Sequence, residues 1–489
     1  MKIIEISKLE FDKYAINHKN KSFYQTSQYG TLMSKNGFND HYIALVDEDK
    51  NILAASLILI QKIFGSFKFA YSPRGFLIDF NNLELLKIFV KLLKENLNRK
   101  GVLYLKIDPN IVHIRRNNQG DSIDNYIEGK ETISNLIEIG FEHKGFNLYF
   151  ETLKPRWNCI IDDTNNIIEK YDKNTRNRIK AAIRKGVYIE KGNKNDIKSF
   201  YNLINKKHTR KLNYYLDYFE IFGKFDMFDI YIAKIDINKF IQNSKKLYEK
   251  ELEENNNIVE KLHLKKDNFN LINKKMASDN MLNIYKNEII KATKLYESKE
   301  NNIIVAATAI IKYGNEIFFL IDGINNKYKD FNANYLLKHE IIDSYSKKEY
   351  KVFNLNGISG DFNKKNKYYG LYDFKSGFNS KVLEYIGEFD IVINKINYSA
   401  FNNIRKFEKI FNYKIKKNWV FSSFIIYWIT FVTTPAPIVC PPSRIENLVP
   451  FSTAIGCINL TTRFTLSPGI TISTPSGNSI SPVTSVVLK

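Results

Sequence analysis

Chemically useful side chains are concentrated in one short stretch, YGLYDFKSGF at residues 369–378, where four aromatic residues and two glycines surround a single lysine. A lysine cation held where water is excluded stabilises an oxyanion as it forms. The glycines would let the backbone close on a ligand, and the aromatic rings would keep water out. The other interpretation is a surface lysine at the end of a buried aromatic strand. The candidate residues here are Gly370, Tyr372, Phe374, Lys375 and Gly377.

Two other phrases join an ionic side chain to a rigid turn. In SPRGF the proline fixes φ and the glycine permits close backbone approach, so Arg74 either binds an anion or is a structural turn arginine. In KIDP the carboxylate of Asp108 follows an apolar strand and precedes a proline. It either caps a turn or points into a cleft as a proton acceptor.

A basic helix is predicted at NTRNRIKAAIRKGV, beginning at Asn174 or Thr175 and ending before Gly186. Guanidinium groups suit phosphates, although a run of charge is often only a solvated face. The phrase HTRKLNYYLDYF then adds Arg210 among tyrosines, which predicts either a sugar-phosphate groove or part of a core. The cations of the helix are Arg176, Arg178, Lys180, Arg184 and Lys185.

The familiar cofactor and catalytic signatures are missing from the sequence. There is no GK[ST] phosphate loop, HExxH, CxxC or Gly-x-Ser-x-Gly, and no glycine-rich turn for a coenzyme pyrophosphate. The three cysteines have neither disulfide nor metal-ligand spacing. We therefore predict no metal and no nucleotide cofactor.

Composition bounds the class of protein. The chain has 489 residues with 44% hydrophobic content, enough for two or three domains. Its formal charge of +21 favours a polyanionic partner, either nucleic acid or an anionic membrane surface, unless the Lys, Asn and Ile usage reflects only an AT-rich genome. The start lacks an apolar stretch suited to a signal peptide, which predicts a cytoplasmic protein.

The segments that must position these side chains are expected to include both strands and helices. HYIALVDEDKNILAASLILIQKI and NIIVAATAIIKYGNEIFFLIDGIN each predict two strands around a turn, and in both halves of the chain a helix and a further strand follow. These patterns predict two mixed domains.

A helical arm is predicted between the strands of the second domain. Residues 239–299 contain no proline or glycine, and an imperfect heptad stripe runs along them through Phe269 and Met276. We predict an antiparallel hairpin whose turn lies at residues 267–268 or at 278–280. The first position gives helices of similar length.

The composition changes after residue 418. Eight of the eleven prolines lie there, and the apolar run at 419–432 is shorter than the roughly 20 residues of a spanning helix. We interpret 419–489 as an atypical tail, either disordered or a coding artefact, with a weak interfacial anchor as the alternative.

Taken in order, the phrases FYQTSQYG, SPRGF, KIDP, the basic helix, NGISG, YGLYDFKSGF and EYIGEFD resemble those of the Fem family of peptidoglycan aminoacyltransferases, the FemA, FemB, FemX and MurM group, over residues 1 to about 415. The resemblance implies an α+β or α/β fold of two acetyltransferase-like (GNAT-like) domains. These would be residues 1–153, and residues 154–238 with 300–418, the arm at 239–299 being an inserted coiled coil.

The resemblance also implies an activity. A Fem-like enzyme moves an amino acid from aminoacyl-tRNA to a stem-peptide amine, or to a growing bridge, of lipid II or a UDP-linked muramyl peptide. It would work at the cytoplasmic face of the membrane, as a peripheral protein, with homologous Fem-type enzymes as partners. The alternatives are a non-catalytic basic protein that binds tRNA or other RNA, and a transferase that uses acyl-tRNA but acts on another amine.

For the site, the family ties its Phe-Lys pair to acyl transfer, which implies that role for Phe374 and Lys375. Asp108 or a substrate phosphate would accept the proton. Where the family often has a substrate-binding lysine this chain has Met33, and Lys35 is the nearest lysine. The arm resembles one likened to the tRNA-gripping arm of seryl-tRNA synthetase, and its alternative role is contact with neighbouring bridge-building enzymes.

Overall fold

The computed structural model describes residues 1–64, 67–123, 127–204, 210–299, 303–401 and 403, with two short strands near the C-terminus. Two compact units are present, Met1–Asn402 and Asn403–Lys489. In the second unit, β16 (Phe464–Thr465) pairs with β17 (Thr471–Ile472). The rest of the predicted tail lies outside the described residues.

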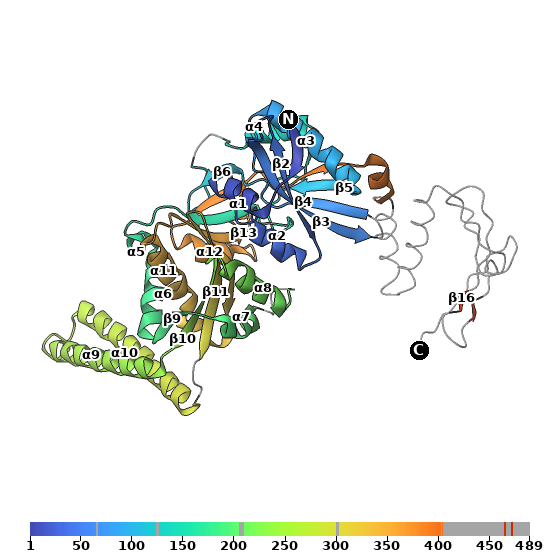
Figure 1. Ribbon diagram of the computed structural model, residues 1–489. Helices are drawn as coiled ribbons and strands as arrows, with labels where there is room; N and C mark the ends of the chain where they lie inside the picture. Colours follow the sequence, from blue (N-terminus) through green and yellow to red (C-terminus); the bar gives the residue numbers. More distant parts are fainter. Residues whose placement is uncertain are drawn as a thin grey trace. The chain divides into compact units, whose positions relative to one another are not determined.

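The N-terminal half of the first unit builds most of a seven-stranded sheet (Figure 1), which runs in the order β1-β2-β3-β4-β5-β15-β7. Its strands are β1 (Lys2–Glu5), β2 (Asn39–Val46), β3 (Ile52–Phe64), β4 (Phe67–Ser72), β5 (Val102–Ile107), β15 (Phe389–Val392) and β7 (Glu142–His143). Its helices are α1 (Lys8–Asn17), α2 (Ser27–Ser34), α3 (Leu83–Arg99) and α4 (Lys130–Glu138). The apolar face of α3, which carries Phe89 and Leu93, packs on this sheet because its buried residues recur every three or four positions.

The second half builds most of an eight-stranded sheet, which runs in the order β6-β14-β8-β13-β12-β11-β10-β9. Its strands are β6 (Val112–Arg116), β14 (Lys381–Tyr385), β8 (Trp157–Ile161), β13 (Val352–Ile358), β12 (Glu316–Ile324), β11 (Ile304–Tyr313), β10 (Phe228–Ile235) and β9 (Val187–Lys191). The short helical elements around it are α5 (Ile167–Lys170), η1 (Lys194–Asp196), α7 (Ile197–Ile204), α8 (Leu212–Gly223) and η2 (Asn326–Phe331). The predicted hairpin around the Gly-Asn turn is β11 and β12.

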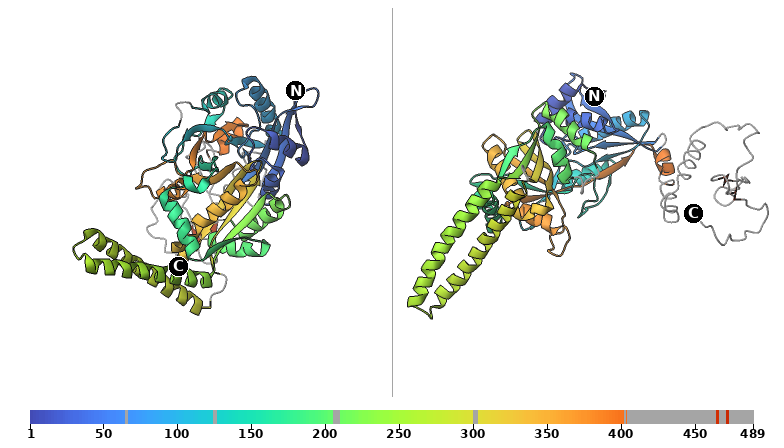
Figure 2. Two further views of the ribbon diagram at one scale, coloured as in Figure 1. Left: turned by 90° about the vertical axis from the view of Figure 1, so that its left-hand side faces the viewer. Right: turned by 90° about the horizontal axis from the view of Figure 1, so that it is seen from below.

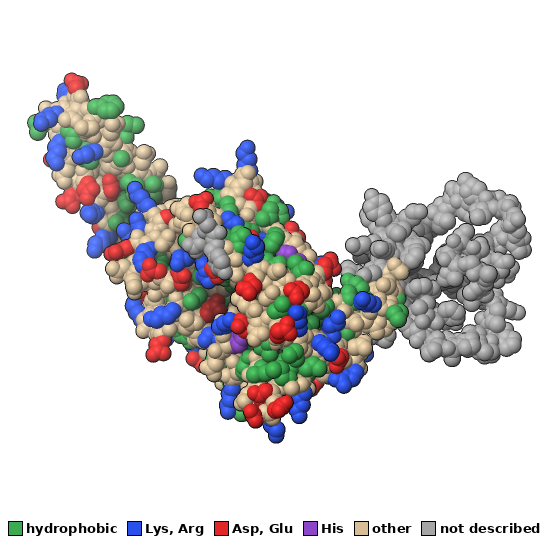
Figure 3. All heavy atoms as spheres, turned by 90° about the horizontal axis from the view of Figure 1, so that it is seen from above, with side chains coloured by type: hydrophobic (Ala, Val, Ile, Leu, Met, Phe, Trp, Pro, Cys, Tyr) green, Lys and Arg blue, Asp and Glu red, His purple; other side chains and the backbone are tan. Residues whose placement is uncertain are grey.

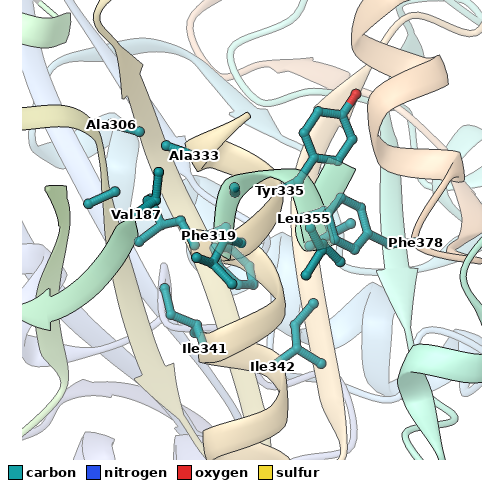
Figure 4. Close-up of a cluster of buried hydrophobic side chains, with 14 of the residues drawn as sticks. Val187, Ala306, Phe319, Ala333, Tyr335, Ile341, Ile342, Leu355 and Phe378 are labelled. Carbon is teal, nitrogen blue, oxygen red and sulfur yellow. The ribbon is translucent and has the colours of Figure 1, made fainter. Parts of the chain in front are cut away.

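One face of this second sheet is covered by α6 (Lys173–Arg184), α11 (Ala333–Ser346) and α12 (Tyr369–Ser376), whose side chains fill a large buried cluster with those of the strands. Figure 4 shows Phe319, Tyr335 and Phe378 of that cluster. The stretch YGLYDFKSGF is therefore helical for most of its length, and the interpretation of it as the end of a strand is wrong.

The two sheets share a core. One buried cluster combines Leu57 and Leu59 of the first sheet with Ile230 and Phe318 of the second, together with residues of α1, α2, α7 and α8. Such a continuous apolar layer keeps both sheets in one compact unit.

The sheets also exchange strands. β6 comes from the N-terminal half but pairs with β14 of the eight-stranded sheet, whereas β15 comes from the C-terminal half and pairs with β5 and β7 of the seven-stranded sheet. The domain limits drawn at residues 153 and 238 stay a prediction, but each of these strands pairs in the sheet of the other half.

The predicted helical hairpin consists of α9 (Ile237–Leu264) and α10 (Phe269–Glu297), which lie side by side in Figures 1 and 2. Its turn contains residues 267–268, the first of the two predicted positions. The predicted packing stripe is wrong beyond the turn, because Phe269 and Met276 are exposed. The turn residues interrupt the helical rotation, so the heptad frame of α9 does not continue into α10.

The base of the arm is tied to the rest of the unit by ion pairs. On α10, Glu288 binds Arg184 of α6 at 2.8 Å, and Lys291 binds Asp330 of η2 at 2.5 Å. Among the described helices, none has the length and apolar run needed to cross a bilayer. The predicted fold class, two mixed sheets with an inserted helical hairpin, is confirmed.

Candidate active site

Lys375 is held inside the protein by backbone carbonyls. Only 3% of the residue is exposed, and its Nζ donates to the carbonyl oxygens of Asn356 at 3.1 Å and Gly357 at 2.8 Å. The interpretation of Lys375 as a surface lysine is therefore wrong. An ammonium group has three N–H donors, so one remains beyond these two bonds.

The two carbonyls are available because β13 is irregular. Relative to β8, β13 contains one extra residue between Asn354 and Gly357. Such a bulge removes backbone groups from the sheet ladder and redirects them. The predicted phrase NGISG is thus the cradle of Lys375.

Burial changes the acidity of Lys375. Loss of water lowers its pKa to about 8, against the opposing effects of the Cys159 thiol and the Asp322 carboxylate, and the Lys338 ammonium lowers the pKa further. Asp322 is itself paired with Lys338 at 2.5 Å. Lys375 is therefore a cation at neutral pH that loses its charge only slightly above it.

Aromatic contacts fix the position of α12. The Tyr372 hydroxyl donates to the carbonyl oxygen of Asn118 at 2.6 Å, and the Phe374 ring packs edge-on against Tyr335 with centroids 4.8 Å apart. Tyr372 is buried and Phe374 is half-buried. The backbone of α12 is thus fixed one residue before Lys375.

The two glycines differ. Gly370 is exposed, whereas Gly377 lies against α6, where its carbonyl oxygen accepts from the backbone N–H of Asp172 at 3.0 Å. A Cβ at Gly377 would lie 2.3 Å from Thr175 Oγ1, and a Cβ at Gly370 would meet no atom within 4 Å. Close approach of the backbone at Gly377 therefore serves the contact between α12 and α6.

We expect Gly377→Ala to lower the free energy of unfolding by about 1–3 kcal/mol, because α6 or α12 must move to admit the methyl group. Gly370→Ala is the matched control. It should be neutral, or stabilise by up to about 1 kcal/mol, since it reduces the backbone entropy of the unfolded chain. Urea unfolding followed by circular dichroism measures both, and equal midpoints for the two variants would refute the packing argument.

A second cluster surrounds Asp108, which follows β5 and is buried. Its Oδ1 accepts from the Tyr71 hydroxyl at 3.0 Å and from the backbone N–H of Arg74 at 2.7 Å. Its Oδ2 has no hydrogen-bond partner among the described residues, and the Nε of Arg74 lies 4.0 Å away. Burial raises the pKa of Asp108 although Arg74 opposes the shift. A carboxylate with a free oxygen and a raised pKa is suited to accept a proton.

Arg74 is buried with its guanidinium turned inward. Its Nη2 donates to the carbonyl oxygen of Pro155 at 2.8 Å, and the group stacks over the Tyr385 ring at 4.3 Å. Pro155 in turn touches Gly357, where a Cβ would lie 2.4 Å from the proline ring. The Lys375 cluster and the Asp108 cluster are therefore joined through Pro155 and Gly357.

Two members of this region were missed in the sequence. Glu316, at the start of β12, accepts from Asn354 Nδ2 at 2.9 Å, and burial raises its pKa while Arg74 opposes that shift. Lys154 donates to the Tyr29 hydroxyl at 3.0 Å and lies over the Tyr24 ring at 4.0 Å. Glu316 could have been identified in the sequence, because it is a glutamate at the start of a buried strand. No local pattern marks Lys154.

The other predicted cations lie apart from Lys375. Lys35 forms an ion pair with Asp217 of α8 at 2.6 Å, which raises its pKa. Arg210 is exposed and stacks over the Tyr214 ring at 4.9 Å. Within the described part of the chain, the contacts of these two cations do not reach Lys375, Asp108 or Arg74.

The basic helix begins at Asp172, whose side chain caps it, rather than at Asn174 or Thr175 as predicted. Arg176 donates to the carbonyl oxygens of Glu169, at 2.9 Å, and Tyr171. Arg178 stacks over the Tyr335 ring at 5.0 Å, and that ring packs on Phe374. Arg178 is thus one aromatic layer away from α12.

A metal site is not evident. Across the described ranges, the His, Cys, Asp and Glu side chains form no group of three or more that could hold a metal ion. That the chain works without metal or nucleotide cofactor stays a prediction.

Comparison with known proteins places this chain in a family. The model of the FemAB family matches residues 6–406. A lipid II:glycine glycyltransferase of Staphylococcus epidermidis is 26% identical over 419 residues, covering 83% of this chain and 96% of the relative. An aminoacyltransferase FemA of Staphylococcus aureus is 25% identical over 430 residues, covering 83% of this chain and 99% of the relative.

The fold agrees with that match. The crystal structure of FemX superposes with a TM-score of 0.63 at 20% identity, covering 82% of this chain and 99% of FemX. The match to the family model spans both sheets and the arm. As the sequence phrases predicted, the chain belongs to the FemAB family and is an acyltransferase.

Proposed function

We propose that this protein transfers an amino acid from aminoacyl-tRNA to the stem-peptide amine, or to a growing bridge, of lipid II. Support for the acceptor comes from the relative named as a lipid II:glycine glycyltransferase. The observation that carries the proposal is the buried ammonium of Lys375, bound to two carbonyl oxygens and retaining one N–H. A UDP-linked muramyl peptide is the alternative acceptor.

The reaction needs a cation and a proton acceptor. The acceptor amine attacks the ester carbonyl, the carbonyl oxygen becomes an oxyanion, and a C–N bond replaces the C–O bond to the terminal ribose of tRNA. The free N–H of Lys375 stabilises the oxyanion. Asp108, through its free oxygen, or a phosphate of the substrate takes the proton of the amine, and the released ribose hydroxyl gains one.

The basic surfaces suit the substrates. Arg178 lies near α12, and Arg210 lies on the exposed side of Tyr214, so both are available to phosphates of tRNA or of the precursor. The protein works in the cytoplasm as a peripheral protein of the inner membrane face, and homologous Fem-type enzymes are its candidate partners.

Transfer of label from charged tRNAs tests the proposal. Each aminoacyl-tRNA, with a radiolabelled amino acid, is incubated with lipid II or with nucleotide-linked precursor and the full chain. Label should reach the precursor from one aminoacyl-tRNA and should be lost in Lys375→Met. Lys367→Met is the control, because that lysine is exposed on the segment before α12. If no charged tRNA donates to either precursor while tRNA still binds, the proposed reaction is wrong.

The pH dependence of transfer should report Lys375. Its pKa of about 8 means that the ammonium is present below pH 8 and is lost above it. An acceptor amine with an ordinary pKa of about 10.4 becomes more reactive over the same range. We expect the logarithm of the single-turnover rate to rise with a slope of about one up to pH 8 and then to level off. In Lys375→Met the slope should continue past pH 8, and a plateau that persists would assign it to another group.

A further inference from the structure

One side of each helix of the arm is buried against the other helix. On α10 the residues facing α9 recur at heptad spacing through Leu271, Ser278 and Tyr285. Within this seam Asn255 of α9 donates to Ser278 Oγ at 3.0 Å, and Ser278 donates to Glu251 at 2.6 Å. A buried polar layer of this kind sets the register of two helices. The apolar residues outside the seam therefore need another explanation.

An exposed apolar patch lies at the far end of the arm. Leu264 ends α9 and is 86% exposed, and Phe269 begins α10 and is 73% exposed. Ile272 and Met276 continue from Phe269 at helical spacing, with 38% and 61% exposed. At 100° per residue this stripe is roughly 150° around α10 from the seam, so packing within the arm cannot bury it. We call these four residues the tip patch.

Lysines border the tip patch. Lys265 and Lys266 occupy the turn, Lys261 precedes it on α9, and Lys274 follows on α10, all exposed. In the described arm, residues 237–299, no ion pair engages these four lysines. The acidic residues of the same stretch, 260–276, are only Glu260 and Asp267. Figure 3 shows apolar and cationic side chains together at this end of the arm.

We propose that the tip patch and its lysines form a docking surface for an anionic lipid bilayer, with the apolar side chains inserted among the headgroups and the lysines on their phosphates. Apolar side chains bordered by cations bind such a surface through both parts. The inference rests on the proposed function in one respect, since a lipid-linked acceptor is what would bring this enzyme to a membrane.

Two other occupants fit less well. A protein partner usually covers about 800 Å² on each side, more than four side chains at a hairpin end provide. A nucleic acid backbone is bound by cations and polar groups, and it gives no reason for exposed leucine, isoleucine and methionine. A bilayer needs neither a large area nor a complementary shape.

Vesicle sedimentation with the full chain tests the docking surface. The probes are vesicles of phosphatidylcholine alone and vesicles that also contain phosphatidylglycerol. We expect the double variant Phe269→Ser, Met276→Ser to weaken binding to the anionic vesicles by about tenfold. Lys265→Gln with Lys266→Gln should remove the preference for phosphatidylglycerol. Tyr296→Ser, an exposed aromatic residue at the other end of α10, is the matched control and should change nothing.

Three outcomes would overturn the inference. The inference is wrong if the wild type does not bind the vesicles, or if the tip variants bind them as well as the wild type does. It is also wrong if the tip variants lose binding to tRNA and keep binding to vesicles. Transfer to a nucleotide-linked precursor in free solution separates this inference from the proposed function, because the tip variants should retain it. If the wild type transfers to no precursor and the vesicle results hold, the proposed function fails and the docking surface stands.

Discussion

Replacing Lys375 with methionine is expected to lower the single-turnover rate of transfer by about 10²–10³-fold, the usual effect of removing one oxyanion donor. Methionine keeps the volume of the buried side chain but lacks the cation that donates to the Asn356 and Gly357 carbonyls. Lys375 makes its described hydrogen bonds to those carbonyls, inside the protein, so tRNA affinity should be retained. Rapid-quench transfer assays and filter binding measure the two quantities.

Stability gives an independent control for this variant. An unfolded lysine titrates near 10.4, whereas Lys375 in the folded protein has a pKa of about 8. Between these values the unfolded chain holds a proton that the folded chain has released, so the free energy of unfolding rises with pH through this window. Lys375→Met should remove that rise. A variant with the wild-type pH dependence of stability and an unchanged transfer rate would show that Lys375 is neither a buried cation nor part of the reaction.

Replacing Glu384 with alanine is expected to destabilise the fold by about 3–5 kcal/mol. Glu384 on β14 accepts from Arg156 and also from Arg116 Nη2, the latter at 2.8 Å. The side chain of Arg156 is 1% exposed and that of Glu384 is 7% exposed. Without the carboxylate, the buried guanidinium group of Arg156 is left unpaired beside that of Arg116, whose side chain is 22% exposed. Leaving a buried charge without its partner is the costly way to break a buried pair. Equilibrium unfolding in urea at neutral pH measures the loss.

The matched control is an ion pair that involves the neighbouring strand, β6. Arg115 of β6 pairs with Glu128, but their side chains are 40% and 35% exposed, so Glu128→Ala should cost at most about 1 kcal/mol. Glu384→Gln keeps an acceptor of the same size and should fall between the two alanine variants. If Glu384→Ala costs no more than Glu128→Ala, the two arginines must reach water in the variant, and the buried network contributes little.

Local patterns were sufficient for much of the fold. The helical arm was predicted from its lack of glycine and proline, and the β11–β12 hairpin from its Gly-Asn turn. Both signals come from residues close together in the chain, and both features form as predicted. The heptad pattern failed where it was extended from α9 through the turn into α10. Phe269 was therefore wrongly placed in the seam between the two helices. The helical form of α12 was missed because its aromatic content favours a strand, whereas Tyr372 and Lys375, both buried, are three residues apart on one face.

The site was predictable only in part. Resemblance selected Lys375 and local sequence context selected Asp108, and the burial of both agrees with functional roles that stay predictions. The surroundings depend on tertiary contacts. Glu316 meets Asn354 only because β12 and β13 are adjacent, and Lys154 meets Tyr29 across 125 residues of sequence. Sequence periodicity does not predict contacts between residues so far apart in the chain.

The late return of the chain to its first sheet bears on how the protein is made. β15 lies between β5 and β7, yet it follows them by more than half of the described chain. While the polypeptide emerges from a ribosome, β5 and β7 must wait with unpaired edges until residues 389–392 have been synthesised. Such edges pair readily with other chains. A chain that ended before residue 389 would thus carry an open sheet edge, which favours association with other chains or degradation, and synthesis through residue 392 supplies the strand that closes it.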